Sequence, residues 1–395
     1  MEKRVLIFLL TVCIFLTGCV IHQPATEPSA TGTDPSASET QPKPVEMDIA
    51  GNDISRYTIL WAPSEYASYR KLYKKYLPGM DFNEETAYRL QSLIMELTGV
   101  ELEVADATGR EIRDYDILVG NVKHAVTGLK EDDYQIFVTG SQLEILGGTY
   151  GTTWHALDDL EKTFREQASQ GKISIPKNFS RTGTYHLLRI GMVGDSITQG
   201  NGSNTEKRGC LSYPMQVGRI LWKECLVYNY GNAGKTMCNH WSNAYIKCST
   251  YQEALEGAAQ LDVMTIMLGT NDAKSVMDVD MGYTENFDQQ YYDSCKELMD
   301  SFSAKNSDLK YYLFNAPEYF GTNARKEGLP YVHAVQLKTV DRLKADGFDV
   351  THVDVYEMTR RMRNTFPDTV HPNSQGHLIL AEKLAEYLQT DLKLG

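Results

Sequence analysis

Positive charge is scarce in this sequence. Its 395 residues include 39 Lys and Arg against 52 Asp and Glu, which gives a formal net charge of −13 at pH 7. A nucleic-acid-binding surface needs basic residues to neutralise phosphates, so this balance argues against a nucleic-acid partner. Hydrophobic residues are plentiful at 42%, which excludes a mainly disordered chain. A chain of this length is expected to form two folded domains.

Paired cysteine motifs are absent. Two of the seven cysteines, Cys13 and Cys19, lie in or directly after an apolar N-terminal run. The other five show no Cys-x-x-Cys pair and no zinc-type spacing with histidine, so we predict no metal site and no cofactor. Buried free thiols are the default expectation, and a disulfide stays open. These five are Cys210, Cys225, Cys238, Cys248 and Cys295.

Long hydrophobic runs are also lacking, except at the N-terminus. Two basic residues precede an apolar run from Val5 to Leu16, which is too short to span a bilayer but long enough for a signal-peptide core. The run ends in the sequence LTGC, which resembles the lipobox of bacterial lipoproteins. We expect residues 1–18 to be removed and Cys19 to anchor the exported chain to the membrane, facing outside the cytoplasm. An ordinary signal peptide with an incidental cysteine is the alternative.

Two segments follow before the second half of the chain. Residues 19–48 are dominated by Pro, Ser, Thr and acidic residues, which predicts an extended linker. Residues 49–181 show an amphipathic helix over 86–97, a strand over 115–119, a hairpin over 134–146 and a helix over 151–164. These elements predict a small α/β domain. Their order and the sequences ILVGN and LEILGGTYGT resemble the accessory domain that precedes the catalytic domain in several glycoside hydrolases.

Strands and helices alternate over residues 185–395. Helical segments such as 291–302 separate five short apolar runs, and a last amphipathic helix covers 374–392. This alternation predicts a parallel sheet with helices on both faces. The five runs cover residues 187–193, 226–229, 263–268, 311–314 and 350–355.

Polar residues gather where these predicted strands end, the edge at which parallel sheets carry their reactive groups. Gly-Asp-Ser ends at Ser196, a glycine-rich loop contains Gly234, Gly-Thr-Asn-Asp contains Asn271, and Asp368 precedes His371 by three residues. Each motif alone is typical of an ordinary turn. Their order is similar to the four marker blocks of the SGNH (GDSL-like) hydrolases, which contain Ser, Gly, Asn and His in that order.

The resemblance covers about half of the chain. It implies a three-layer α/β/α sandwich with a parallel, flavodoxin-like sheet. It also implies that Ser196 is the nucleophile, that His371 is its base, and that Asp368 orients the histidine. The oxyanion hole would be formed by Ser196, Gly234 and Asn271.

Several other side chains near these motifs have competing interpretations. Asp354 is an alternative partner for His371, although pairing within the sheet is favoured for it. Asp195 and Asp272 are expected to bond to their own turns. His377 is expected to be a surface or packing residue. The role of the loop over 319–326 stays ambiguous. The loop after Gly234 forms either a sugar-binding wall or, through Trp241, part of the core. Its candidate residues are Asn239, His240, Trp241 and Asn243.

The signal sequence, the accessory domain and the SGNH motifs together predict an extracellular serine esterase that removes short acyl groups, acetyl above all, from carbohydrate. The first alternative is a lysophospholipase or thioesterase of the same fold, which would need a hydrophobic channel. The second is a carbohydrate-binding lipoprotein without activity, which the intact motifs disfavour. A glycosidase would need a carboxylate pair that the second half does not offer.

Overall fold

A computed structural model describes residues 44–64, 67–77, 81–123, 128–277 and 286–394. Residues Pro44–Gly395 form one compact unit. The predicted signal peptide, Cys19 and most of the predicted linker lie outside the described residues, so their predictions stay untested. In the part of the chain that the structure describes, no helix is both long and apolar enough to cross a membrane.

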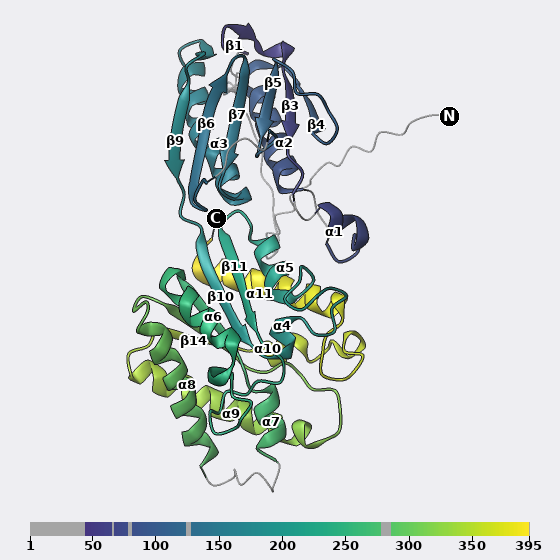
Figure 1. Cartoon of the computed structure of the whole chain (residues 1–395), viewed down its shortest axis with the longest axis vertical. Coiled ribbons are helices and arrows are strands. Elements are labelled where there is room, and N and C mark those ends of the chain that lie inside the picture. The colour runs from purple at the N-terminus through teal and green to yellow at the C-terminus, as the bar shows by residue number, and fades with distance from the viewer. Residues whose placement is uncertain (1–43, 65–66, 78–80, 124–127, 278–285, 395) are drawn as a thin grey trace, which may run out of the picture. The chain divides into compact units, whose positions relative to one another are not determined.

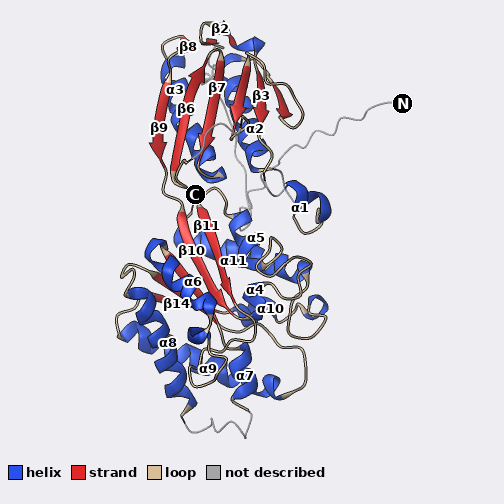
Figure 2. Cartoon of the chain, in the orientation of Figure 1, coloured by secondary structure: helices blue, strands red, loops and turns tan. Residues whose placement is uncertain are grey.

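The first half is built around a six-stranded sheet with the order β4-β3-β5-β7-β6-β9 (Figures 1 and 2). The strands β4, β3, β5 and β7 are parallel to one another. At one edge of the sheet, β6 is antiparallel to both of its neighbours, β7 and β9. Helices α2 (Phe82–Thr98) and α3 (Tyr150–Ala168) pack against this sheet and against each other. The strand bounds are β3 Thr58–Trp61, β4 Glu103–Asp106, β5 Asp116–Val119, β6 Asp133–Thr139, β7 Gln142–Gly147 and β9 Ser180–Thr184.

Local sequence explains the helix boundaries in this half. Asp81 caps α2 and forms a capping box with Glu84, and Gly99 ends the helix with a φ of 73°. The predicted helices over 86–97 and 151–164 are parts of α2 and α3, and the predicted hairpin is the β6–β7 pair. A second, three-stranded sheet contains β1 (Glu46–Ile49), β2 (Asn52–Asp53) and β8 (Lys172–Ile175).

Two strands extend across domain limits that the sequence predicts. Strand β1 begins inside the segment predicted as a linker over 19–48, because Met47 and Ile49 are buried and pair with β8. Strand β9 continues past residue 181 to Thr184 through its pairing with β6. The strands β3, β4 and β8 were not predicted, since each has only four residues, the lower limit for a strand pattern. The other domain limits stay predictions.

The second half contains a five-stranded parallel sheet with the order β11-β10-β12-β13-β14. All four pairings are parallel, and the order in sequence terms, 2-1-3-4-5, is the flavodoxin-like one. The first strand, β10, lies between the second and the third, so successive strands are added to the sheet on opposite sides of β10. The bounds are β10 Leu188–Gly194, β11 Cys225–Gly231, β12 Val263–Met267, β13 Lys310–Phe314 and β14 Val350–Val353.

Two apolar cores show that helices cover both faces of this sheet. Met264 and Ile266 of β12 pack with α6 (Ser249–Gly257), α8 (Phe287–Ser303) and α9 (Ala324–Ala345). The alternate residues Val263 and Met267 pack with α5 (Tyr213–Ile220) and α11 (Ser374–Leu392). The predicted three-layer α/β/α sandwich is therefore confirmed. The short helices α4 (Ser196–Gln199), α7 (Thr270–Ser275) and α10 (Val355–Thr359) follow β10, β12 and β14.

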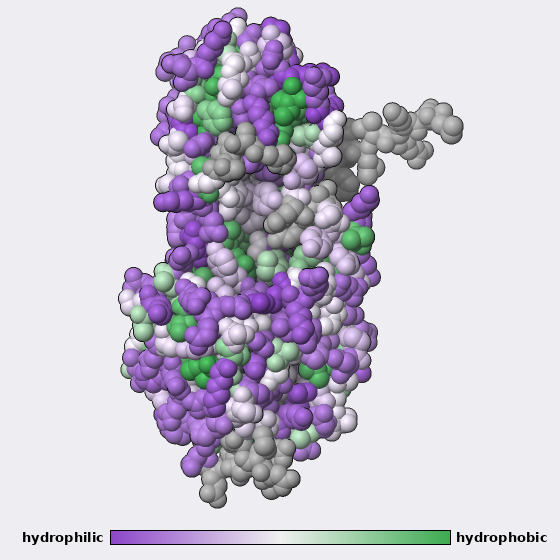
Figure 3. All heavy atoms as spheres, viewed as in Figure 1, coloured by the Kyte–Doolittle hydropathy of each residue, from purple (hydrophilic) through white to green (hydrophobic). Residues whose placement is uncertain are grey.

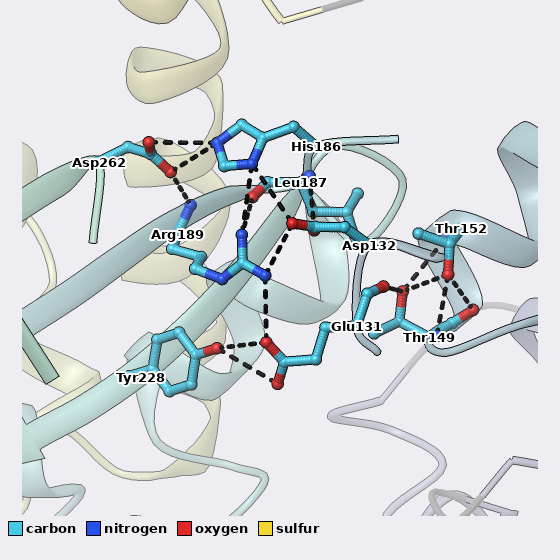
Figure 4. A network of polar contacts seen from close by, with 9 residues as sticks. All are labelled: Glu131, Asp132, Thr149, Thr152, His186, Leu187, Arg189, Tyr228 and Asp262. Carbon is cyan, nitrogen blue, oxygen red and sulfur yellow. Dashed lines mark hydrogen bonds and ion pairs between the residues drawn. The ribbon is translucent and has the colours of Figure 1, made fainter. Parts of the chain in front are cut away.

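Polar side chains join the two sheets where β9 leads into β10 (Figure 4). The guanidinium of Arg189 on β10 lies 3.0 Å from Asp132 and 3.3 Å from Glu131, both just before β6. His186, in the connection, bonds Asp262 at 3.2 Å. On the face shown in Figure 3, hydrophilic residues predominate and hydrophobic ones appear in small separate patches. The apolar residues of this chain thus lie mainly in the cores beside the sheets.

Candidate functional site

Ser196 sits at the carboxyl end of β10, the strand that lies between β11 and β12 in the sheet. The strand ends at Gly194, Asp195 caps the next turn by accepting the N–H of Ile197 at 2.9 Å, and Ser196 is the first residue of α4. The residue is 7% exposed. The strand-to-helix turn thus holds its hydroxyl at the sheet edge, as the Gly-Asp-Ser motif predicts.

His371 links this serine to a carboxylate. Its Nε2 lies 2.8 Å from Ser196 Oγ, and its Nδ1 lies 2.6 Å from Asp368 Oδ2. The other carboxylate oxygen accepts the backbone N–H of Val370 at 3.0 Å and of His371 at 2.7 Å. Thr369 adopts a left-handed φ of 72°, which closes this turn. Residues 175 positions apart in the sequence are therefore brought into one line of hydrogen bonds.

The charge state of Asp368 follows from these contacts. Burial raises its pKa, but the hydrogen bonds from His371 and Val370 outweigh burial and hold the pKa below its usual value. An ionised carboxylate only accepts hydrogen bonds, so the proton between it and the ring belongs to Nδ1 of His371. In the neutral imidazole, Nε2 then carries no proton and accepts the hydrogen bond from the hydroxyl of Ser196.

The predicted oxyanion residues lie in one cluster beside this line. Asn271, on α7, donates from Nδ2 to the carbonyl of Lys235 at 2.9 Å and to Asp195 Oδ2 at 3.4 Å. Lys235 directly follows Gly234, and Asp195 directly precedes Ser196. Gly234 is exposed and has a φ of 74°, and a Cβ there would meet nothing within 4 Å. Its backbone conformation, not crowding, favours glycine.

Sequence reasoning missed Arg325 at the start of α9. Its Nε donates to the carbonyl of Thr270 at 2.9 Å, and its Nη2 lies 3.5 Å from Asn271 Oδ1. A guanidinium only donates, so it holds the oxygen of the amide on its side and leaves the NH₂ group toward Asp195 and Lys235. Arg325 belongs to the loop region over 319–326 that the sequence left ambiguous, and no motif spacing pointed to it.

Two buried aspartates lie beside the cluster. Asp195 bonds to its own turn, as predicted, and burial raises its pKa. For Asp272 the expectation of bonding to its own turn misses its main partners, the N–H groups of Met237 at 2.9 Å and Cys238 at 3.0 Å. These partners fix the loop that follows Gly234. Burial raises the pKa of Asp272 to about 6.

The remaining candidates have structural contacts. Asp354 caps α10 and accepts a hydrogen bond from Asn315 at 2.9 Å, so it is not the partner of His371. His377 is fully buried against the N–H of Tyr213 and the carbonyl of Asn201, which makes it a packing residue rather than a surface one.

The loop after Gly234 divides between packing and surface. Trp241 is 4% exposed and belongs to the apolar core. Asn243 donates to the carbonyl of Gly234 at 2.7 Å, Asn239 bonds Ser294 and Glu297, and His240 is exposed. The packing interpretation therefore holds for Trp241.

A cavity of about 430 Å³ lies away from this site, between the ends of β5 and β7 and helix α5. Its lining includes Asn121, Tyr150 and Trp222 but none of the residues in the serine site. The five cysteines in the described residues are free thiols. Within the same residues, no group of three or more His, Cys, Asp or Glu side chains is placed to hold a metal ion.

Comparison with known proteins gave a family match and several structural neighbours. A family two carbohydrate esterase from Clostridium thermocellum in complex with cellohexaose is 18% identical, with a TM-score of 0.40 over 54% of this chain and 68% of its own. A carbohydrate acetylesterase family member from Sinorhizobium meliloti is 19% identical, with a TM-score of 0.39 over 53% of this chain and 100% of its own. The native aryl esterase of M. smegmatis is 16% identical, with a TM-score of 0.40 over 51% and 99%.

No curated protein sequence matched the chain. Residues 192–379, however, match the model of the GDSL-like lipase/acylhydrolase family. The matched segment runs from the end of β10 into α11 and contains every residue of the serine site. Over residues 192–379 the chain is therefore similar to the GDSL-like lipase/acylhydrolase family.

Proposed function

We propose that this chain is a serine esterase that hydrolyses short-chain acyl esters, acetyl esters above all, on carbohydrate. The observation that carries the proposal is the unbroken hydrogen-bond line from Ser196 through His371 to Asp368. The match of residues 192–379 to the GDSL-like lipase/acylhydrolase family supports ester hydrolysis as the reaction class. The carbohydrate part rests on the resemblance of residues 49–181 to the accessory domains of glycoside hydrolases.

The first chemical step is acylation. Nε2 of His371 takes the proton of Ser196 Oγ while this oxygen attacks the ester carbonyl. The imidazolium that forms is stabilised by Asp368, and it then gives the proton to the departing alcohol of the sugar. A new ester bond to Ser196 replaces the bond to the sugar. The same base takes a proton from water in the second step, which releases the acid and restores the hydroxyl.

Negative charge develops on the carbonyl oxygen in both steps. The donors proposed for it are the backbone N–H groups of Ser196 and Gly234 and the side-chain amide of Asn271. The bond from Asn271 to Asp195 is long at 3.4 Å, so this N–H is the weakly held one and is the donor that turns to the oxyanion. The buried Asp195 and Asp272 fix the loops around the donors and take no part in proton transfer.

Acetate release tests the proposal directly. The wild-type protein and Ser196→Ala would be compared on acetylated xylan, on acetylated sugars and on p-nitrophenyl esters of increasing chain length. We expect acetate release that Ser196→Ala abolishes, with rates that fall as the acyl chain lengthens. A preference for long acyl chains would contradict the proposed substrate class. Equal rates for the two proteins would contradict the proposed nucleophile.

We also propose that the chain is exported and anchored to the membrane through a lipid on Cys19. The support is the apolar run and the LTGC sequence that ends it. Cells that express the chain would be labelled with a fatty acid, with Cys19→Ser as the matched control. Label on the wild-type chain that is missing from Cys19→Ser is the expected result. Equal labelling of both chains, or of neither, would contradict the anchor.

A further inference from the structure

A cluster of positive charge stands out in this acidic protein. The sequence between Glu65 and Asp81 contains no acidic residue, although the whole chain carries a formal net charge of −13. Residues 67–77, which we name the basic arm, consist of α1 (Ala67–Leu72) and the turn after it. α1 lies outside the two large sheets and the helices that cover them (Figure 1). The four basic residues of this stretch are Arg70, Lys71, Lys74 and Lys75.

The side chains of the basic arm are presented to solvent. Lys71, Lys74 and Lys75 are exposed, and in the described part of the chain their ammonium groups form no ion pair. Other lysines of the chain are paired, such as Lys223 with Glu85. Tyr69 is 46% exposed and Leu72 is 75% exposed. Unpaired ammonium groups next to the exposed ring of Tyr69 form a surface suited to a ligand with carboxylates and flat faces.

The basic arm is joined to the edge of the serine site. The hydroxyl of Tyr73 donates to the carbonyl of Asn204 at 2.9 Å, and the N–H of Asn204 donates to Ser374 Oγ at 3.0 Å. Ser374 follows His371 by three residues. In the same loop a Cβ on Gly202 would lie 3.1 Å from the Cβ of His371. The loop that packs against the proposed base therefore also contacts the basic arm through the hydroxyl of Tyr73.

We propose that the basic arm binds an acidic polysaccharide, a uronic-acid-containing glycan whose acyl esters are the substrate of the Ser196 site. This inference rests on the proposed function and narrows its substrate class. Ammonium groups attract the carboxylates, while the net negative charge of the rest of the protein repels the polymer. The polymer is thus drawn to the basic arm, whose Tyr73 contacts the loop beside the site. Tyr69 supplies an exposed ring against which a sugar ring can lie.

An anionic membrane surface is a different occupant, and the arm is poorly built for it. A helix that lies in a membrane interface needs an apolar face made of several large side chains. In α1 the only large aliphatic residue is Leu72, and the helix has six residues. The bond from Tyr73 to Asn204 also fixes the arm to the loop beside His371. These observations favour, over a membrane surface, a ligand that contacts both the basic arm and the serine site.

Two variants with the same change in net charge show whether the position of the lysines, and not the total charge of the protein, determines binding. The arm variant carries Lys71→Gln, Lys74→Gln and Lys75→Gln. The control variant carries three equivalent changes at other exposed lysines that form no ion pair in the described part of the chain. Neither set removes a buried contact, so both proteins are expected to fold. The control positions are Lys162, Lys177 and Lys305.

Acetate release from acetylated polygalacturonate is the first readout. Exposed charge pairs contribute little each, so we expect the arm variant to raise KM about 3- to 10-fold with kcat unchanged. Salt at about 1 M, where the screening length is about 3 Å, should bring the wild type to the same KM. The control variant should match the wild type. Acetylated xylan and p-nitrophenyl acetate, which are neutral, should not distinguish the three proteins.

A KM for the arm variant equal to that of the control variant would overturn the proposal. Loss of binding to phosphatidylglycerol vesicles in the arm variant, with no change in KM, would overturn it in favour of a membrane surface. Binding of unacetylated polygalacturonate, measured by calorimetry with Ser196→Ala, needs no turnover. If the proposed function is wrong, the protein cleaves no ester. Calorimetry still tests the proposal in that case, because the arm variant should bind unacetylated polygalacturonate more weakly than the control variant.

Discussion

Replacement of Asn271 by alanine removes the side chain that joins the loop after Gly234 to the serine turn. The amide donates to Lys235 at 2.9 Å and, weakly, to Asp195 at 3.4 Å. Alanine leaves the backbone of α7 in place, and Asp195 keeps its bond from Ile197. Loss of these side-chain bonds should lower the free energy of unfolding by about 1–2 kcal/mol. The protein should therefore stay folded.

The effect on catalysis should be much larger than the effect on stability. Removal of one oxyanion donor typically raises the activation free energy by about 3 kcal/mol, so kcat should fall about 100-fold or more. KM should change by less than about threefold, because the donor acts on charge that exists only in the transition state. This split between kcat and KM distinguishes an oxyanion donor from a residue that binds the substrate.

Arg325 provides a second set of variants for the same experiment. Its guanidinium holds the amide oxygen of Asn271, so Arg325→Met should free the amide to rotate and lower kcat about 3- to 10-fold. If Arg325 is a positioning residue that acts only through this amide, the double variant should be no slower than Asn271→Ala alone. Arg325→Lys should not restore the rate, because lysine lacks the fork that bonds two oxygens.

The wild type and the four variants would be compared by initial rates on p-nitrophenyl acetate, with circular dichroism and thermal unfolding as folding controls. Wild-type turnover in folded Asn271→Ala would refute the oxyanion assignment. Full additivity of the two substitutions would refute the positioning role of Arg325 and indicate that its guanidinium contacts the substrate itself.

Four further outcomes follow from the geometry. Asp368→Asn should lower kcat between about 100- and about 10 000-fold, measured on the same ester, because the amide does not fix the Nδ1–H tautomer of His371; an unchanged rate would point to another partner. Gly202→Ala should also lower kcat, because the new Cβ lies 2.3 Å from the carbonyl of Pro372 and at a φ of 90°; wild-type kinetics would show that the loop yields freely. Burial lowers the pKa of His377 from 6.5 to about 4, so the unfolded chain binds the extra proton and about 3 kcal/mol of stability is lost as pH falls from 6.5 to 4. Urea unfolding of His377→Gln should lack this loss, and a parallel pH dependence would contradict it. Burial raises the pKa of Asp272 from 3.8 to about 6, so here about 3 kcal/mol is lost as pH rises from 3.8 to 6; Asp272→Asn should remove that loss, and an unchanged slope in the same titration would count against the burial argument.

The sheet of the second half was predictable because its strands are buried on both faces. Such strands are continuous apolar runs, and all five runs that the sequence predicts are strands in the structure. Each predicted end lies within two residues of the observed one, for instance Cys225–Gly231 where 226–229 was predicted. Helix 374–392 was predicted at its observed limits, because its apolar spacing and the preceding Asn373 cap define both.

The first half was only partly predictable. Strands such as β4, with no buried residue, and β8, with alternate residues exposed, form because neighbouring strands supply their hydrogen bonds. The pairing of β9 with β6 joins residues 133 and 184. Local periodicity contains no information on pairing between residues so far apart in the sequence. The same limit applies to β1, which the composition assigned to a linker.

The sequence by itself determined the reacting residue types, because parallel strands end at one sheet edge and each motif follows such a strand. It named Ser196, Asn271 and His371 before any geometry was known. The family resemblance had already named Asp368 as the partner of His371, and the tertiary structure excludes the alternative, Asp354, which caps α10. Only the tertiary structure placed Arg325 against Asn271 and the basic arm against Asn204. These contacts join segments far apart in the chain, and their distances depend on the packing of whole helices and loops, which no local pattern encodes.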